Sequence, residues 1–164
     1  MATGVHLKPS HAQIAPADSA RLRQFLLLIL LIESLSIGAE LLLLAHTEDP
    51  WQWVPLALIL GCTLTLGWCA VHPRRAAVRA LQGLMALFVL SGILGVFLHF
   101  RAKTEFQLEV NPSLQGSALF WEAVKSQSPP TLAPGIMIQM GLLGFAYAYR
   151  HPALRGLAQQ EKTG

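Results

Sequence analysis

Four long apolar stretches constrain this chain more than any other feature of its sequence. They occupy residues 25–45, 54–71, 80–100 and 132–149. Each contains 18 to 21 residues, so as a helix it would extend roughly 27–31 Å, close to the thickness of a bilayer's hydrocarbon core. We therefore predict an all-α integral membrane protein with four transmembrane helices. The predicted helices run over about residues 25–46, 54–71, 78–100 and 132–149.

The composition agrees with this class. The chain is 53% hydrophobic and 13% charged, with a mean hydropathy of +0.47, whereas a soluble domain has roughly a quarter of its residues charged. Arg21 and Arg23 precede the first stretch, as basic residues precede a secretory signal. However, this stretch is longer than the apolar part of a signal peptide, and "AHTEDPW" after it offers no small-x-small cleavage site. We expect it to be retained as a helix.

The basic residues predict the orientation. Nine of the twelve lysines and arginines fall on one side of the predicted helices: Lys8, Arg21, Arg23, Arg74, Arg75, Arg79, Arg150, Arg155 and Lys162. By the positive-inside rule, both termini are cytoplasmic, with a cytoplasmic segment 1–24, a transmembrane domain 25–149 and a cytoplasmic tail 150–164. The same asymmetry explains the net charge of +3, so no nucleic-acid partner is predicted. The expected location is a bacterial inner (plasma) membrane.

The second and fourth stretches resemble each other at an offset of 79 residues. "VPLALILGCTLTLGWCAVHP" and "APGIMIQMGLLGFAYAYRHP" both place proline near the start and His-Pro at the end. Proline suits the first turn of a helix, and a closing His-Pro ends one. The match predicts two helical hairpins related by an internal repeat.

The outer loop, residues 101–131, is long for a connection within a hairpin. Asn111 followed by Pro112 has the pattern of a helix N-cap and first turn, which predicts a helix from there to about Ser126. Leu114 and Trp121 recur at helical spacing, so this helix would be amphipathic. We expect it to lie on the outer membrane surface or to cover the helix bundle.

Two carboxylates interrupt the first apolar stretch. Glu33 and Glu40 are seven residues apart, so they lie within about 20° of the same direction on a helix, roughly 10 Å apart. A charge in the bilayer core is costly unless it faces protein or water. The polar residues at similar depth predict an intramembrane polar stripe: Glu33, Ser36, Glu40, Thr63, Thr65, Ser91 and Gln139.

Three hypotheses account for these glutamates. As neutral acids they would tether helices by hydrogen bonds. Alternatively, they could handle protons or cations, or pair with a basic residue of another subunit. Glu33, near mid-membrane on the first of four predicted helices, resembles the glutamate of small multidrug exporters, and this resemblance implies proton-coupled transport.

Histidines and outer acidic residues are the candidates for cofactor binding. His46 with His99, and His72 with His151, form two level pairs at helix ends, which could ligate haem b or simply cap helices. A second candidate cluster on the outer face could hold a metal ion or a quinone head group, or could be a solvated acidic surface. It comprises His46, His99, Glu105, Glu109 and Glu122. We predict no bound cofactor.

The sequence contains no nucleotide-binding loop, nucleophile elbow or HExxH motif, so no catalytic residue is assigned. The leading hypothesis is a small, non-catalytic subunit or accessory protein of a membrane complex, bound to the lipid bilayer and to a protein partner or a second copy. The alternatives are a proton-coupled transporter using Glu33 and Glu40, and a redox anchor that binds haem b or quinone.

Overall fold

The computed structural model describes residues 16–44, 50–126 and 132–155. Within these ranges every regular element is a helix. The elements are α1 (Pro16–Leu43), the 3-10 helix η1 (Pro50–Gln52), α2 (Trp53–Val71), α3 (Arg75–Val110), α4 (Gly116–Lys125), α5 (Leu132–Ala148) and α6 (Pro152–Arg155). The prediction of an all-α protein is confirmed at this level.

Three of the helical segments are long and apolar enough to cross a membrane. They are Ala17–Leu43, Pro50–Val71 and Arg75–Val110. Only 11% of the apolar window of the first segment is buried, so most of its apolar side chains face outward, as lipid-facing side chains do. The apolar part of α5, Pro134–Ala148, is shorter. These features identify a membrane protein.

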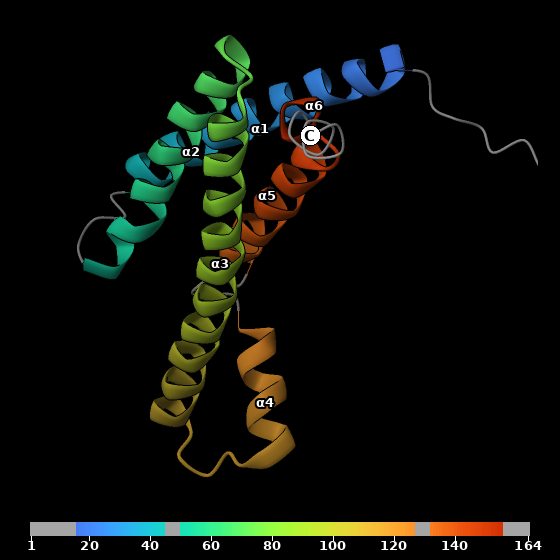
Figure 1. Ribbon diagram of the computed structural model, residues 1–164. Helices are drawn as coiled ribbons and strands as arrows, with labels where there is room; N and C mark the ends of the chain where they lie inside the picture. Colours follow the sequence, from blue (N-terminus) through green and yellow to red (C-terminus); the bar gives the residue numbers. More distant parts are fainter. Residues whose placement is uncertain (1–15, 45–49, 127–131, 156–164) are drawn as a thin grey trace, which may run out of the picture.

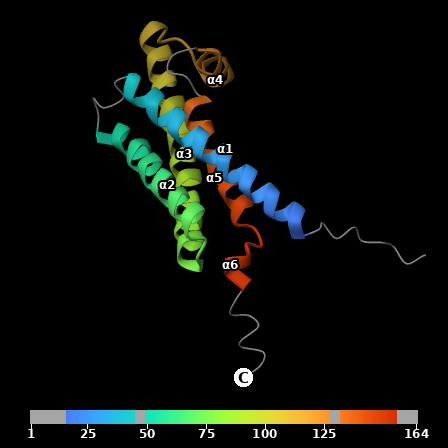
Figure 2. The same ribbon diagram turned by 90° about the horizontal axis from the view of Figure 1, so that it is seen from above.

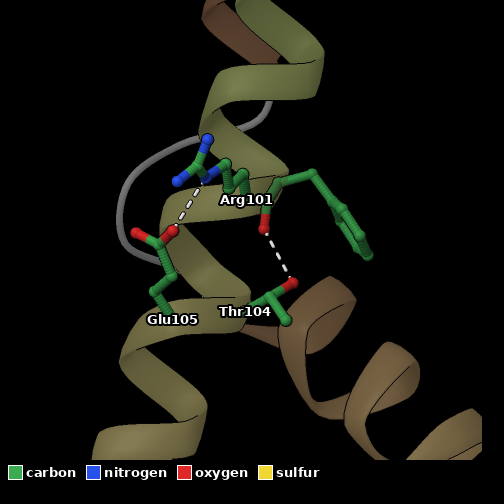
Figure 3. A network of polar contacts seen from close by, with 4 residues as sticks. Arg101, Thr104 and Glu105 are labelled. Atoms are coloured by element: carbon green, nitrogen blue, oxygen red, sulfur yellow. Dashed lines mark hydrogen bonds and ion pairs between the residues drawn. The ribbon is translucent and has the colours of Figure 1, made fainter.

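Helices α1 and α3 are longer than predicted. The helix α1 begins at Pro16, nine residues before the expected start at residue 25, because proline fits the first turn and Asp18 favours the positive end of the helix dipole. The helix α3 runs ten residues past the expected end at residue 100. Its extension contains no glycine or proline and carries a salt bridge from Arg101 to Glu105, 2.7 Å long and one turn apart (Figure 3).

The prediction that Asn111 opens the outer helix is wrong. Asn111 ends α3, where its N–H donates to the carbonyl of Gln107, and its side chain then accepts hydrogen bonds from Ser113 in the following turn. A residue before proline avoids the helical conformation, so Pro112 stops α3 at this point. The helix α4 starts only at Gly116.

The helix α4 packs beside the C-terminal part of α3 and touches no other helix within the described ranges (Figure 1). A tilted Phe100–Phe120 pair with ring centroids 5.6 Å apart joins the two helices. Beneath α4 the almost fully buried Lys103 donates to the carbonyl of Ser126, 2.5 Å away. We call α3 beyond residue 100 together with α4 the outer hairpin. It stands away from the bundle, so α4 is not the cover over the bundle that one of our two expectations described.

The four long helices pack in a ring. The helix α1 contacts α2 and α5, and α3 contacts the same two helices on its own side. In Figures 1 and 2, α2 and α5 run opposite to α3, and α1 lies at a steep angle across them. The core between them is apolar and includes Leu30, Ile59, Leu66, Leu81, Met85, Phe88 and Met140.

The closest helix pair is α3 with α5, and two glycines make this approach possible. A Cβ atom on Gly92 would lie 2.8 Å from the carbonyl oxygen of Pro134 and 2.9 Å from the nitrogen of Ile138. Conversely, a Cβ atom on Gly141 would lie 2.8 Å from the carbonyl oxygen of Met85. Backbone therefore packs directly on backbone, as in membrane helix pairs that use small residues.

Candidate functional site

The intramembrane carboxylate Glu33 lies at the edge of the contact between α1 and α5. Its Oε1 accepts a long hydrogen bond, 3.4 Å, from Nε2 of Gln139. Its Oε2 is buried and has no hydrogen-bond partner among the described residues. Such an atom is costly to bury, because it gives up hydration without a replacement. Glu33 is therefore a polar group in the bundle whose bonding is incomplete.

Two further polar residues of α1, Ser36 and Glu40, face outward. Ser36 and Glu40 are exposed on the same side of the helix as Glu33, and Gln139 is exposed next to them on α5. We call Glu33, Ser36, Glu40 and Gln139 the polar strip. The sequence contains no lysine or arginine in any of the four apolar stretches, so this chain supplies no basic side chain at the same depth.

The other members of the predicted stripe lie elsewhere. Thr63 bonds to Ser34, with 2.6 Å between the two hydroxyl oxygens, and donates back to the carbonyl of Ile59. Thr65 donates to the carbonyl of Gly61 one turn earlier on α2. Ser91 is half-buried on α3. The two threonine hydroxyls are thus satisfied within or between helices and do not join Glu33.

Sequence analysis missed the role of Ser34. Ser34 is fully buried and binds α1 to α2 through Thr63. Ser34 lies four residues after the buried Leu30 and so on the core face of α1, which the almost unbroken apolar run around it does not reveal. Depth alone placed Thr63 level with Glu33, but the direction of each side chain around the helix decides the partner.

The histidines do not share one arrangement. His72 is exposed at the C-terminus of α2, and His99 is half-buried on α3. His151 is buried at the corner between α5 and α6, where its ring packs against Tyr147 with centroids 5.4 Å apart. His46 lies outside the described residues.

His151 holds the N-terminus of the short helix α6. Its Nδ1 accepts a hydrogen bond from the backbone N–H of Ala153 at 3.2 Å, so the proton of the neutral ring sits on Nε2. Burial lowers the pKa of His151 from its ordinary value, and the nearby positive charge of Arg23 lowers it further. Both effects keep the ring neutral, which is the state that can accept this bond.

The acidic residues of the outer loop are paired or exposed along the outer hairpin. Glu105 pairs with Arg101, and Glu122 lies 3.4 Å from Lys125. Glu109 is exposed near the end of α3. The described residues contain no group of three or more His, Cys, Asp or Glu side chains arranged to hold a metal ion.

Comparison with known proteins adds no identification: no family model matches the chain, and no curated protein or solved structure matches it. The function must therefore be argued from the polar strip and its surroundings.

Proposed function

We propose that this protein is a non-catalytic subunit of a membrane complex, and that its polar strip docks a transmembrane helix of a partner protein. In this proposal α1, α2, α3 and α5 form two membrane-spanning hairpins in a bacterial inner membrane. Both termini and the α2–α3 turn face the cytoplasm, and the outer hairpin lies on the opposite side.

The observation that carries the proposal is the exposure of Ser36 and Glu40 within the apolar stretch of α1. A carboxylate facing hydrocarbon costs about 2.5 kcal/mol or more on insertion scales, so an exposed glutamate in a span favours a covering helix. A second copy of this chain brings no lysine or arginine at that depth. A different protein with a basic or hydrogen-bonding residue in its own span complements the strip better.

Photo-crosslinking in living cells tests this docking. A photoreactive amino acid at Ser36 or Glu40 should form one crosslinked product of defined mass, and the same product should arise at both positions. Leu35 and Leu42 provide matched controls, because they are exposed at similar depth but lie on the far side of α1. These positions should give no such product.

Three outcomes contradict the proposal. Equal crosslinking at all four positions would mean that α1 has no preferred face. A product with the mass of two copies of this chain would mean that the strip docks a second copy and not a different protein. No product at Ser36 or Glu40 would mean that lipid covers the strip.

Proton-coupled transport is a second candidate, favoured by the buried and unpaired Oε2 of Glu33. An ionised carboxylate in an apolar bundle attracts a lipophilic cation, and protonation would release it. Purified protein should then bind tetraphenylphosphonium more tightly at pH 8 than at pH 5, and Glu33→Gln should abolish the binding. Equal binding by the wild type and Glu33→Gln would remove this candidate.

A haem or quinone anchor is the third candidate, and it depends on the histidine pairs that the sequence suggests, His46 with His99 and His72 with His151. An absorption spectrum of the protein purified in mild detergent tests the haem directly. A Soret band that disappears in His99→Ala would support ligation, whereas a colourless preparation with an intact fold would argue against it.

A further inference from the structure

A cleft of about 350 Å³ opens at the end of the molecule where α1, the C-terminus of α2 and the α5–α6 corner meet. This is the end opposite the outer hairpin (Figure 1). The lining residues that matter for its chemistry are Arg23, Gln24, Leu27, Cys69, Tyr147 and His151. None of them belongs to the polar strip.

The cleft has a polar mouth and a largely buried wall. Gln24 is exposed and Arg23 is half-buried at the mouth. Deeper in, Tyr147 and His151 are 4% and 7% exposed, so little beyond their cleft-facing atoms remains accessible. Cys69 adds an apolar surface next to them, because it is a free, buried thiol.

The charge of Arg23 is not neutralised by a carboxylate among the described residues. Its Nη2 donates to the hydroxyl of Ser19 at 3.1 Å, a neutral partner one turn earlier on α1. Six further arginines belong to the chain segments at this end: Arg21, Arg74, Arg75, Arg79, Arg150 and Arg155. Asp18 is the one acidic residue in the described segments 16–24, 72–79 and 149–155. This imbalance favours an anionic ligand.

The position of the cleft along α1 favours an amphiphile over a soluble anion. Arg23 and Gln24 end the polar lead-in of α1, and the apolar stretch begins at the next residue. Leu27 lines the cleft one turn further into that stretch. The polar and apolar parts of the cleft therefore meet where the head-group region of a bilayer meets its hydrocarbon core.

We propose that this cleft binds an anionic phospholipid, with the guanidinium of Arg23 contacting the phosphate and an acyl chain lying against Leu27. A guanidinium suits this role because its fork of N–H groups matches the oxygens of a phosphate. Basic pockets between helices on the cytoplasmic side are a general means of binding such head groups. The proposal requires only that α1 crosses a membrane, and it does not depend on the docking partner.

The test uses the full chain purified in mild detergent, with bound lipid counted by native mass spectrometry and stability followed by thermal melting. Phosphatidylglycerol should bind and should raise the melting temperature, whereas phosphatidylcholine should do so much less. Arg23→Gln should weaken phosphatidylglycerol binding by about fivefold, as expected for one basic group at a lipid surface. Arg21→Gln is the matched control, because Arg21 is exposed on the same helix and does not line the cleft.

The outcomes separate the possible sources of the phosphate. If millimolar inorganic phosphate raises the melting temperature as much as phosphatidylglycerol does, the lipid site would be overturned. Equal weakening by Arg21→Gln and Arg23→Gln would overturn the cleft as the location, since surface charge alone would then explain the effect. If Arg23→Gln fails to fold, Arg23→Lys takes its place and should bind more weakly than the wild type, because lysine lacks the guanidinium fork. Wild-type protein that does not prefer phosphatidylglycerol to phosphatidylcholine would overturn the proposal without any variant.

Discussion

Replacing Gly92 by alanine should force α3 and α5 apart. The new Cβ would lie 2.8 Å from the carbonyl oxygen of Pro134, whereas ordinary contacts at such positions begin at 3.4 Å. The helices must therefore separate by the difference, 0.6 Å, at their tightest point. Two of the obstructing atoms belong to the backbone of α5, so a change in the rotamer of Ile138, whose Cγ1 would lie 2.6 Å away, cannot relieve the clash. Overpacking of this kind costs about 1–3 kcal/mol.

Thermal melting in mild detergent measures this cost. The folded fraction at each temperature is read from the monodisperse peak in size-exclusion chromatography. At about 2–4 °C per kcal/mol for a chain of this size, the melting temperature should fall by roughly 2–12 °C. Gly83→Ala is the matched control on the same helix, because nothing lies within 4 Å of its Cβ position. It should melt at or above the wild-type temperature, since alanine is the better helix former. Equal melting temperatures for Gly92→Ala and Gly83→Ala would refute the close crossing of α3 and α5.

Three further predictions concern single contacts. Ser34→Ala should lower the free energy of unfolding by about 0.6 kcal/mol, because the hydrogen bond to Thr63 between two membrane helices is lost. A loss above about 2 kcal/mol in a detergent unfolding titration would contradict this assignment. Lys103→Ala should leave the carbonyl of Ser126 without its donor and speed hydrogen exchange in α4; unchanged exchange would show that this bond does not hold the outer hairpin. Burial lowers the pKa of His151 below its ordinary 6.5, so at mildly acidic pH the unfolded chain binds a proton that the folded chain does not. The free energy of unfolding should therefore fall as the pH drops below about 6.5. In His151→Asn, which can still cap α6, the difference between melting at pH 5 and pH 8 should shrink, and an unchanged difference would exclude His151 as the titrating group.

The sequence predicted the helical class and the apolar spans because the length of an apolar run can be counted along the chain without knowing how the helices pack. It also placed Glu33 and Gln139 in the same seven-residue polar stripe, without pairing the two residues. It could not predict that Thr63 bonds to Ser34, or that Gln139 bonds to Glu33. These pairings depend on how each helix is rotated about its axis against its neighbour.

The outer loop and the α5–α6 corner were predicted less well, for local reasons. Asn111 followed by Pro112 suits the end of one helix as well as the start of another, and the strong helix formers before it decided the outcome. The cleft around Arg23 and His151 was not predicted. It combines residues that are more than a hundred positions apart in the sequence, and neither residue belongs to a recognisable motif.

The proposed topology depends most on α3 crossing the membrane outward and α5 crossing back. Single cysteines at Ala76, Glu109 and Tyr149, in a background with Cys62→Ala and Cys69→Ala, test this with a membrane-impermeant maleimide. All three native side chains are exposed, so labelling should report sidedness and not burial. In intact cells, or spheroplasts of a bacterium, we expect labelling at Glu109→Cys alone, with Ala76→Cys and Tyr149→Cys labelled only after disruption. Labelling of Tyr149→Cys from outside would contradict a fourth span, and labelling of all three in intact cells would contradict the membrane topology as a whole.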